Sequence, residues 1–423
     1  MKALGLPVFW GGHMASAIPE EAARCGCVDY VGISEGEYTL LELLEVIQGR
    51  RAPESVLGIA YVDENGAYHR TGDRPFADLA DFPPLDYSLV PVERFLFRLQ
   101  FSDNVFMMVT SKGCVHNCTF CSNKEYNRCQ RRDIPNEVLF KQMKDLAENL
   151  GVKGLMFFDE FFGADKRKLR TFCEGLKELN LGLTWWAETT VSAMTREDLQ
   201  MMHDAGCRAL AFGLESGSAE VRKAVRKHYD ASKVDEVLRD CREIGILVAV
   251  GLILALPDET PEQVRETVRL YFRTQPDIVR LPYFSPIPGT QLYRSLVEAG
   301  RLRAPKTLED MGTQILGWDS LTVNFSRVPD KDLRVIKKYM HWQMVFGKKR
   351  KIPQAKRSRS LKMAFDNLRI YLRCAGLRGL ARGLWDAAKF VCGVAWYANA
   401  YPSIRKKYDL YAKNLGRTDW GDQ

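Results

Sequence analysis

Six short apolar runs follow one another between residues 105 and 284, and stretches with helical periodicity separate them. Strands that alternate with helices predict a parallel sheet with right-handed crossovers, so the expected fold class is α/β. Six such repeats favour a partial (βα)6 TIM-like barrel, and an open sheet is the alternative. The six runs cover residues 105–110, 154–158, 183–187, 209–214, 247–254 and 277–284.

The chain around this array divides into further regions. The N-terminal region contains two apolar runs, each followed by a helix-like stretch, which predicts a partial Rossmann-like unit. The next region is rich in Pro, Gly and Asp and predicts a linker, with a hairpin at Asn65-Gly66. The region after the array predicts basic helices. The expected divisions are the partial Rossmann-like unit 1–50, the linker 51–103, the barrel core 104–325 and the basic helical region 326–423.

Positive charge is concentrated near the C-terminus. The whole chain has a net charge of +8, but residues 348–407 hold sixteen Lys or Arg and two Asp, so this segment carries +14 and the rest −6. Apolar side chains recur at helical spacing among these basic residues. The segment predicts either peripheral contact with an anionic membrane surface or a helical cap on the barrel. Nucleic-acid binding is the less favoured alternative.

The cysteines indicate a reducing compartment. The chain has eleven of them, most scattered singly, and no run of 18 or more uncharged apolar residues occurs. The first residues make a poor signal peptide, because Pro and Gly-Gly follow a single Lys. We therefore expect reduced thiols and a cytoplasmic location, with association at the inner face of the membrane through residues 348–407.

Three cysteines, Cys114, Cys118 and Cys121, come directly after the first apolar run. Thiolates suit iron–sulfur clusters and zinc. Acidic and turn-forming residues follow the later runs, so a barrel would gather them with the cysteines at the carboxyl ends of its strands, where active sites lie. A structural zinc site completed by His116 or Cys129 is the alternative. The acidic residues that follow the runs include Asp159, Glu160, Glu188, Glu215 and Glu259.

The spacing Cys-x3-Cys-x2-Cys, with Phe120 just before the last cysteine, resembles the signature of radical S-adenosylmethionine (SAM) enzymes. The resemblance implies a [4Fe–4S] cluster on the three cysteines, with SAM bound at the open fourth iron. An electron from the cluster would then cleave SAM to a 5′-deoxyadenosyl radical. Phe120 belongs to the implied cofactor-binding residues, and later stretches of the chain resemble the same superfamily.

These later stretches imply separate contacts to SAM. Asp159 and Glu160 match the acidic residues that contact its amino group, and Glu215 and Ser216 match a turn that reaches its ribose or methionine end. Gly217 would allow that turn to be tight. The backbone from Gly251 to Ile253 matches the strand that runs beside adenine. Of the pair Trp185-Trp186, one ring facing the barrel mouth would pack on substrate, although ordinary core positions are the plainer interpretation.

Residues 10–45 resemble the C-terminal end of the cobalamin-binding domain that precedes many radical SAM barrels, in class B methyltransferase-like members. The resemblance implies cobalamin as a further cofactor, with His13 near the corrin or its tail. The first strands and helices of such a domain are missing ahead of Leu6, and half a sheet would expose strand edges and apolar faces. We expect either a fragment of a longer chain or a remnant that packs on the barrel and binds no cobalamin.

The resemblance implies a radical SAM enzyme that transfers a methyl group, with cobalamin, to an unactivated carbon or to phosphorus. A cobalamin-independent cyclase or rearrangement enzyme is one alternative, and a non-catalytic metal- or membrane-binding module is another. The enzyme would need a small-molecule substrate and an electron donor such as flavodoxin or ferredoxin. Membrane contact through the basic segment would favour a hydrophobic substrate. No catalytic side chain is indicated beyond the cofactor-binding residues.

Overall fold

The computed structural model describes residues 4–305, 320–346 and 400–410, together with Leu384, Ala388, Cys392 and Trp396. Its largest sheet has seven strands in the order β13-β12-β11-β10-β9-β6-β5. Six of them are parallel and coincide with the six apolar runs, so the predicted array is confirmed. The parallel strands are β6 (Ser102–Met108), β9 (Gly154–Phe157), β10 (Thr184–Thr189), β11 (Cys207–Glu215), β12 (Leu247–Leu252) and β13 (Ile278–Arg280).

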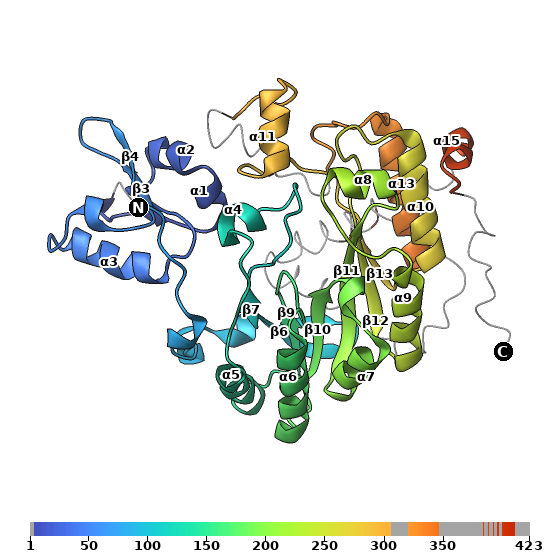
Figure 1. Ribbon diagram of the computed structural model, residues 1–423, viewed down its shortest axis with the longest axis horizontal. Coiled ribbons are helices and arrows are strands. Elements are labelled where there is room, and N and C mark those ends of the chain that lie inside the picture. The colour runs from blue at the N-terminus through green and yellow to red at the C-terminus, as the bar shows by residue number, and fades with distance from the viewer. Residues whose placement is uncertain are drawn as a thin grey trace.

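The sheet curls into a partial barrel with helices along its outer face (Figure 1). The outer-facing strand residues, such as Trp185, Phe212 and Val250, join the largest buried cluster with apolar residues of these helices. Since successive residues of a strand point to opposite faces, their neighbours line the concave inner face. The helices that follow the parallel strands include α5 (Asn136–Glu148), α6 (Lys166–Leu179), α7 (Arg196–Asp204), α8 (Ala219–Ala224), α9 (Lys233–Ile244), α10 (Pro261–Thr274) and α11 (Gln291–Glu298).

Several of these helices begin with local capping chemistry. Thr195 and Thr260 each form a capping box with the residue three positions on, at the starts of α7 and α10. Asp165 accepts hydrogen bonds from two backbone N–H groups at the start of α6. Such caps satisfy backbone donors that have no partner inside the helix, which sets where each helix starts relative to the strand before it.

One strand of the barrel sheet lies in the stretch expected to be a linker. β5 (Phe97–Leu99) pairs antiparallel with β6 at the sheet edge, and its register shifts between Phe97 and Leu99. Three residues carry too little periodicity to predict a strand, so β5 owes its conformation to the exposed edge of β6. The hairpin expected at Asn65-Gly66 is present, and it joins the N-terminal sheet rather than standing alone.

The N-terminal sheet has four strands in the order β1-β2-β3-β4, and it lies beside the barrel (Figure 1). Only β1 and β2 are parallel to each other; β3 and β4 form the hairpin. Within the described residues β1 is an edge strand, and α3 leaves Leu41, Leu44 and Ile47 exposed, as half of a Rossmann-like sheet would. The elements are β1 (Phe9–Trp10), α1 (His13–Ala17), α2 (Pro19–Arg24), β2 (Tyr30–Gly32), α3 (Glu37–Ile47), β3 (Ile59–Val62) and β4 (Tyr68–Arg70).

The described end of the basic region packs on the barrel. Helix α15 (Pro402–Lys407) lies against α13 (Asp330–Phe346), and Asp332 accepts a hydrogen bond from the buried Tyr408 hydroxyl at 2.9 Å. Arg269 pairs with Asp409 at 2.9 Å from the side of α10. This part acts as the predicted helical cap, whereas most of residues 348–407, on which the membrane and nucleic-acid hypotheses rest, lies outside the described residues. Among the helices described, none is both long and apolar enough to cross a bilayer.

The close approach of α10 to Gly217, just after β11, can be tested by substitution. A Cβ at this position would lie 2.3 Å from the Glu266 carbonyl oxygen and 2.6 Å from the Thr267 nitrogen, both backbone atoms. Gly217→Ala should therefore lower the free energy of unfolding by about 2–3 kcal/mol, measured by urea denaturation. Gly36→Ala is the control, since a Cβ there meets open space. Equal stability of the two variants would contradict this close approach.

Candidate functional site

The three cysteines lie in one loop that leaves the carboxyl end of the first parallel strand. The loop begins with β7 (Ser111–Lys112), carries the cysteines, continues into α4 (Asn123–Asn127) and ends at β8 (Arg132–Asp133), which pairs with β7. The Asn123 amide closes the cysteine turn, because its Oδ1 accepts from the Cys114 N–H at 2.9 Å. Its Nδ2 donates to the Cys114 and His116 carbonyl oxygens at 2.6 and 3.1 Å.

Asp159 and Glu160, at the end of β9, hold the start of this loop. The buried Asp159 carboxylate accepts hydrogen bonds from the Thr110 N–H at 2.7 Å, the Thr110 hydroxyl at 2.5 Å and the Ser111 hydroxyl at 2.6 Å. Glu160 accepts from the Gly113 N–H at 3.0 Å and from the Asn127 side chain at 3.3 Å. Both carboxylates therefore bind the loop itself: Asp159 is buried against it, and Glu160 is exposed with one contact to the loop at each oxygen.

The surroundings of the sulfur atoms suit soft metal ligation. The His116 N–H points to the Cys114 Sγ, and the Asn123 N–H points to the Cys121 Sγ, each at 3.5 Å. Burial raises the pKa of the Cys118 thiol to about 11, so an unliganded Cys118 keeps its proton. The side-chain oxygens of Asn117 and Thr119, on either side of Cys118, are buried without a hydrogen-bond partner among the described residues. These orphaned groups and three thiols in one turn fit a bound cluster.

The zinc alternative gains no support from the described part of the chain. The Cys129 thiol donates to the His116 carbonyl oxygen at 3.5 Å. No three or more His, Cys, Asp and Glu side chains within the described ranges stand at the spacing of a shared metal ion. This holds for the three cysteines of the loop as well as for a set completed by His116 or Cys129.

Lys227 is a charged neighbour of the thiols that the sequence patterns did not reveal. Its Nζ lies 3.2 Å from the Glu215 carboxylate, and that pairing, together with the nearby Cys118 sulfur, raises the pKa of Lys227 against the opposing effect of burial. Glu215 has a left-handed φ of 60°, which turns the chain at the end of β11. Glu215 ends β11, and Lys227 lies three residues after α8, the helix that follows β11. The short segment after β11 therefore brings Lys227 back to Glu215.

Ser216 does not face the loop. Its side chain is fully buried, with its hydroxyl 3.1 Å from that of Thr267 and accepting from the Ser218 N–H at 3.1 Å. The tight turn expected of Gly217 is made instead by the positive φ of Glu215, and Gly217 serves the close approach of α10. Residues 215–217 therefore lie at the carboxyl end of β11, as predicted. Glu215 makes the turn, Ser216 is buried against Thr267, and Gly217 allows α10 to approach.

Phe120 and Ile253 pack against one buried cluster at the mouth of the barrel. Both contact the buried cluster that contains Leu256 and Phe284. The Ile253 N–H donates to the Glu215 carbonyl oxygen at 2.8 Å, which joins β12 to the turn beside Lys227. Gly251, two residues earlier, pairs with Gly213 on β11 and adds no side chain to the inner face. The structure thus brings these three residues to the same end of the sheet as the cysteine loop.

The N-terminal unit packs on the cysteine loop through the carboxyl ends of β1 and β2. His13, just after β1, stacks on Tyr126 with ring centroids 3.7 Å apart, and its Nδ1 lies 3.4 Å from the Ser122 hydroxyl. Glu35, just after β2, forms a double ion pair with Arg132, at 2.5 and 3.0 Å. His13 therefore contacts the cysteine loop at Ser122, the residue that follows Cys121.

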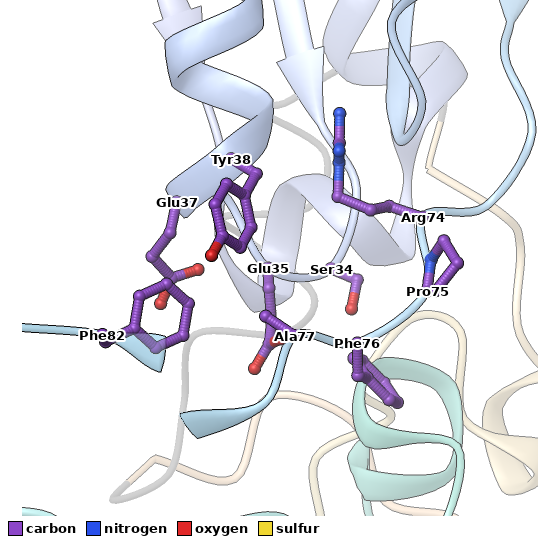
Figure 2. A pocket seen from close by; sticks show the side chains of 9 residues that line it. All are labelled: Ser34, Glu35, Glu37, Tyr38, Arg74, Pro75, Phe76, Ala77 and Phe82. Carbon is purple, nitrogen blue, oxygen red and sulfur yellow. The ribbon is translucent and has the colours of Figure 1, made fainter. Parts of the chain in front are cut away.

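A small pocket marks this junction (Figure 2). It lies between the start of α3 and the segment from Arg74 to Ala77. Phe76 from that segment contacts two guanidinium groups of the loop, with Arg128 4.6 Å and Arg132 4.2 Å from its ring centroid. Lys112 pairs with Glu37 at 2.6 Å from the other side. The loop is thus held before its cysteines by the Lys112–Glu37 ion pair and after them by the Phe76 ring.

The barrel of the described chain is thus partial and TIM-like, and three thiols lie in one loop at the carboxyl end of its first parallel strand. The sequence pattern described as "Radical SAM superfamily" matches residues 108–271, so the chain contains a radical SAM domain. This match runs from the last residue of β6 into α10 and includes all three cysteines.

Two curated relatives each match about two thirds of this chain. The chain is 27% identical over 290 residues to "Uncharacterized methyltransferase PH0819" of Pyrococcus horikoshii, covering 68% of this chain and 62% of that protein. It is 25% identical to "Anaerobic magnesium-protoporphyrin IX monomethyl ester cyclase" of Rubrivivax gelatinosus, covering 68% and 53%. The chain therefore spans less than two thirds of the length of these relatives.

A solved structure shares the fold. The cobalamin-dependent SAM radical enzyme OxsB, with aqua-cobalamin and S-adenosylmethionine bound, matches with a TM-score of 0.64 at 16% identity. The match covers 96% of this chain and 66% of that chain, so it includes the N-terminal unit as well as the barrel. At this identity the likeness concerns the fold alone.

Glu259 lies in the turn after β12, and its burial predicts a pH dependence of the protein's stability. Its side chain is 1% exposed, and neither carboxylate oxygen has a hydrogen-bond partner in the described part of the chain, although the Ala255 and Leu256 amides lie near. Burial raises the pKa of Glu259 from 4.5 to about 8. Between these values the folded protein holds one more proton than the unfolded chain, so this residue's contribution to stability falls as pH rises.

Glu259→Gln removes this titration. The stability of the variant relative to the parent chain should rise by roughly 1 kcal/mol per unit between pH 5 and 8, measured by denaturant unfolding at several pH values. Glu262→Gln is the control on the exposed side of the α10 start, and it should follow the parent chain. A pH-independent difference for Glu259→Gln would refute the proton uptake.

Proposed function

We propose that this chain is a radical SAM enzyme that reductively cleaves S-adenosylmethionine at a [4Fe–4S] cluster held by Cys114, Cys118 and Cys121. When bound, the cluster and SAM supply one-electron cleavage of SAM to methionine and a 5′-deoxyadenosyl radical. The observation that carries the proposal is the cysteine turn itself. Its three thiols stand at the carboxyl end of the barrel sheet, braced by Asp159 and Glu160.

Different residues around the cysteine turn would contact different parts of SAM or hold the turn in place. The cation of Lys227, beside the thiols and paired with Glu215, suits the carboxylate of SAM. Phe120 and Ile253 supply an apolar surface at the barrel mouth for an aromatic base. Asp159 and Glu160 act as positioning residues, because their oxygens are engaged by the loop. An external electron donor, such as flavodoxin or ferredoxin, would reduce the cluster.

The proposed outcome is methyl transfer to an unactivated carbon or to phosphorus, which the relative named as a methyltransferase supports. A cyclase is the second candidate, because another relative of similar identity is named as one. For cobalamin, the edge formed by the ends of β1 and β2 would be the expected contact. The described groups there, His13, Ser34 and Glu35, contact the cysteine loop, and we derive no step through cobalamin.

Anaerobic reconstitution with iron and sulfide tests the proposal. The loaded protein, given dithionite and SAM, should form 5′-deoxyadenosine, and Cys118→Ala should lose this product and most of the bound iron. Cys173→Ala is the matched control, because that thiol is also buried but lies in α6, within the helical side of the core. A folded, iron-loaded parent chain that never cleaves SAM would instead favour a binding module.

Cluster loading should also depend on Asp159. Asp159→Ala removes the acceptor of three hydrogen bonds at the start of the cysteine loop, so iron per chain should fall at least several-fold after reconstitution. Asp165→Ala provides the comparison, because it removes a carboxylate that caps α6 and should cost about 1 kcal/mol of stability without loss of iron. Equal iron contents, measured with circular dichroism to verify folding, would show that the brace is unnecessary.

A further inference from the structure

The inner face of the barrel sheet has a floor made of small residues. Strand pairing places Ala211 beside Ala249, and Gly213 beside Gly251, on adjacent strands β11 and β12. The same pairing places Glu188 beside Ala211 and Arg280 beside Gly251. Paired residues of neighbouring strands point to the same face of a sheet, so all six positions line the concave side. The Glu215 carboxylate and the Lys227 Nζ lie over Gly213, 2.5 and 3.0 Å from where its Cβ would be. Above Gly251 there is space, since only backbone atoms of the described residues lie within 4 Å of the corresponding point.

A charged pair crosses the floor through that space. Arg280 on β13 reaches Glu188 on β10, with its Nη1 2.6 Å from the carboxylate, although two strands lie between them. The side chains of Arg280 and Glu188 remain 41% and 30% exposed. The guanidinium lies 5.4 Å from the Trp186 ring, which is 4% exposed on the same face. The pair therefore has protein beneath it and an open side above.

Arg280 and Trp186 on this floor carry more hydrogen-bond donors than the described acceptors around them engage. The guanidinium has five N–H donors in a planar fork, and Glu188 engages one of its nitrogens. The indole Nε1 of Trp186 is buried without a partner in the described part of the chain. An unpaired donor in an apolar setting is costly, so both groups favour a ligand that brings an acceptor, best a negatively charged one.

Apolar side chains flank the same space. Met107 on β6 pairs with Met156, and Met156 pairs with Trp186, which places all three on the inner face. Met107 and Phe158 are 52% and 59% exposed, and Val109, two residues beyond Met107, is exposed as well. Exposed apolar residues facing a concave surface beside a few polar groups are typical of a small-molecule site.

We propose that this floor is the substrate site, and that it takes an apolar molecule bearing a carboxylate, held by Arg280. The carboxylate would bind on the open side of the Arg280–Glu188 pair, and the apolar part would lie against Met107, Val109 and Phe158. Arg280 is then the residue that determines specificity, and Glu188 sets how much of its charge remains available. This inference rests on the proposed function only in treating the bound molecule as a substrate.

The test measures binding rather than turnover. The reconstituted full chain is titrated with 1-pyrenebutyrate, an apolar fluorescent carboxylate, and separately with its uncharged methyl ester. The acid should bind at least about tenfold more tightly than the ester, as expected for one charge-assisted hydrogen-bonded contact. Arg280→Gln should weaken binding of the acid by about tenfold or more and leave the ester unchanged. Glu188→Gln should tighten binding of the acid several-fold, because it removes the competing carboxylate.

Arg269→Gln is the matched control, since Arg269 is a similarly exposed arginine in an ion pair with Asp409 on the outside of the barrel. It should change neither titration. Equal affinity for acid and ester, no saturable binding of the acid, or parallel losses of acid and ester in Arg280→Gln would each overturn the proposal. A chain that cleaves SAM but fails this test refutes only the carboxylate site, whereas one that passes it but never cleaves SAM refutes only the proposed function.

Discussion

The hydrogen bonds of Asp159 link the two strand ends on which the site depends. One buried carboxylate at the end of β9 gathers a backbone N–H and two hydroxyls at the start of the cysteine loop. β6 and β9 are neighbours in the sheet, so their carboxyl ends meet at one edge. Without such a brace, a long loop that carries its own buried polar groups would lose the geometry of its thiols. The position of the cysteines therefore follows from the sheet and not from the loop alone.

The N-terminal unit completes the support from the opposite side. In a Rossmann-like sheet the carboxyl ends of the parallel strands are where ligands bind. Here those ends contact the loop through the His13–Tyr126 stack and the Glu35–Arg132 ion pair. The sequence analysis left two outcomes for this unit, a fragment or a remnant packed on the barrel. The contacts place the unit against the cysteine loop, and the exposed leucines of α3 are the apolar face that half a sheet was expected to leave, so both alternatives stay predictions.

Much of the fold was predictable, because six apolar runs with intervening helical periodicity specify six parallel strands. Individual side-chain roles were less so. Asp159 lies where the pattern placed it, but its partners are Thr110 and Ser111, about fifty residues earlier in the chain. Ser216 points into the interior, toward Thr267 on α10. A short motif shows which end of a strand a residue occupies, whereas the direction of its side chain depends on the helix that packs against it.

The sequence by itself determined the six parallel strands, the helices between them, and the three thiols at the end of the first strand. These are local properties, since they follow from residue spacing along one segment. Only the tertiary structure decided which of two adjacent tryptophans faces the lumen, and that Arg280 meets Glu188 from 92 positions away. The physical reason is the curl of the sheet, which brings strands β10 and β13 within one side chain's reach across a floor of glycine and alanine.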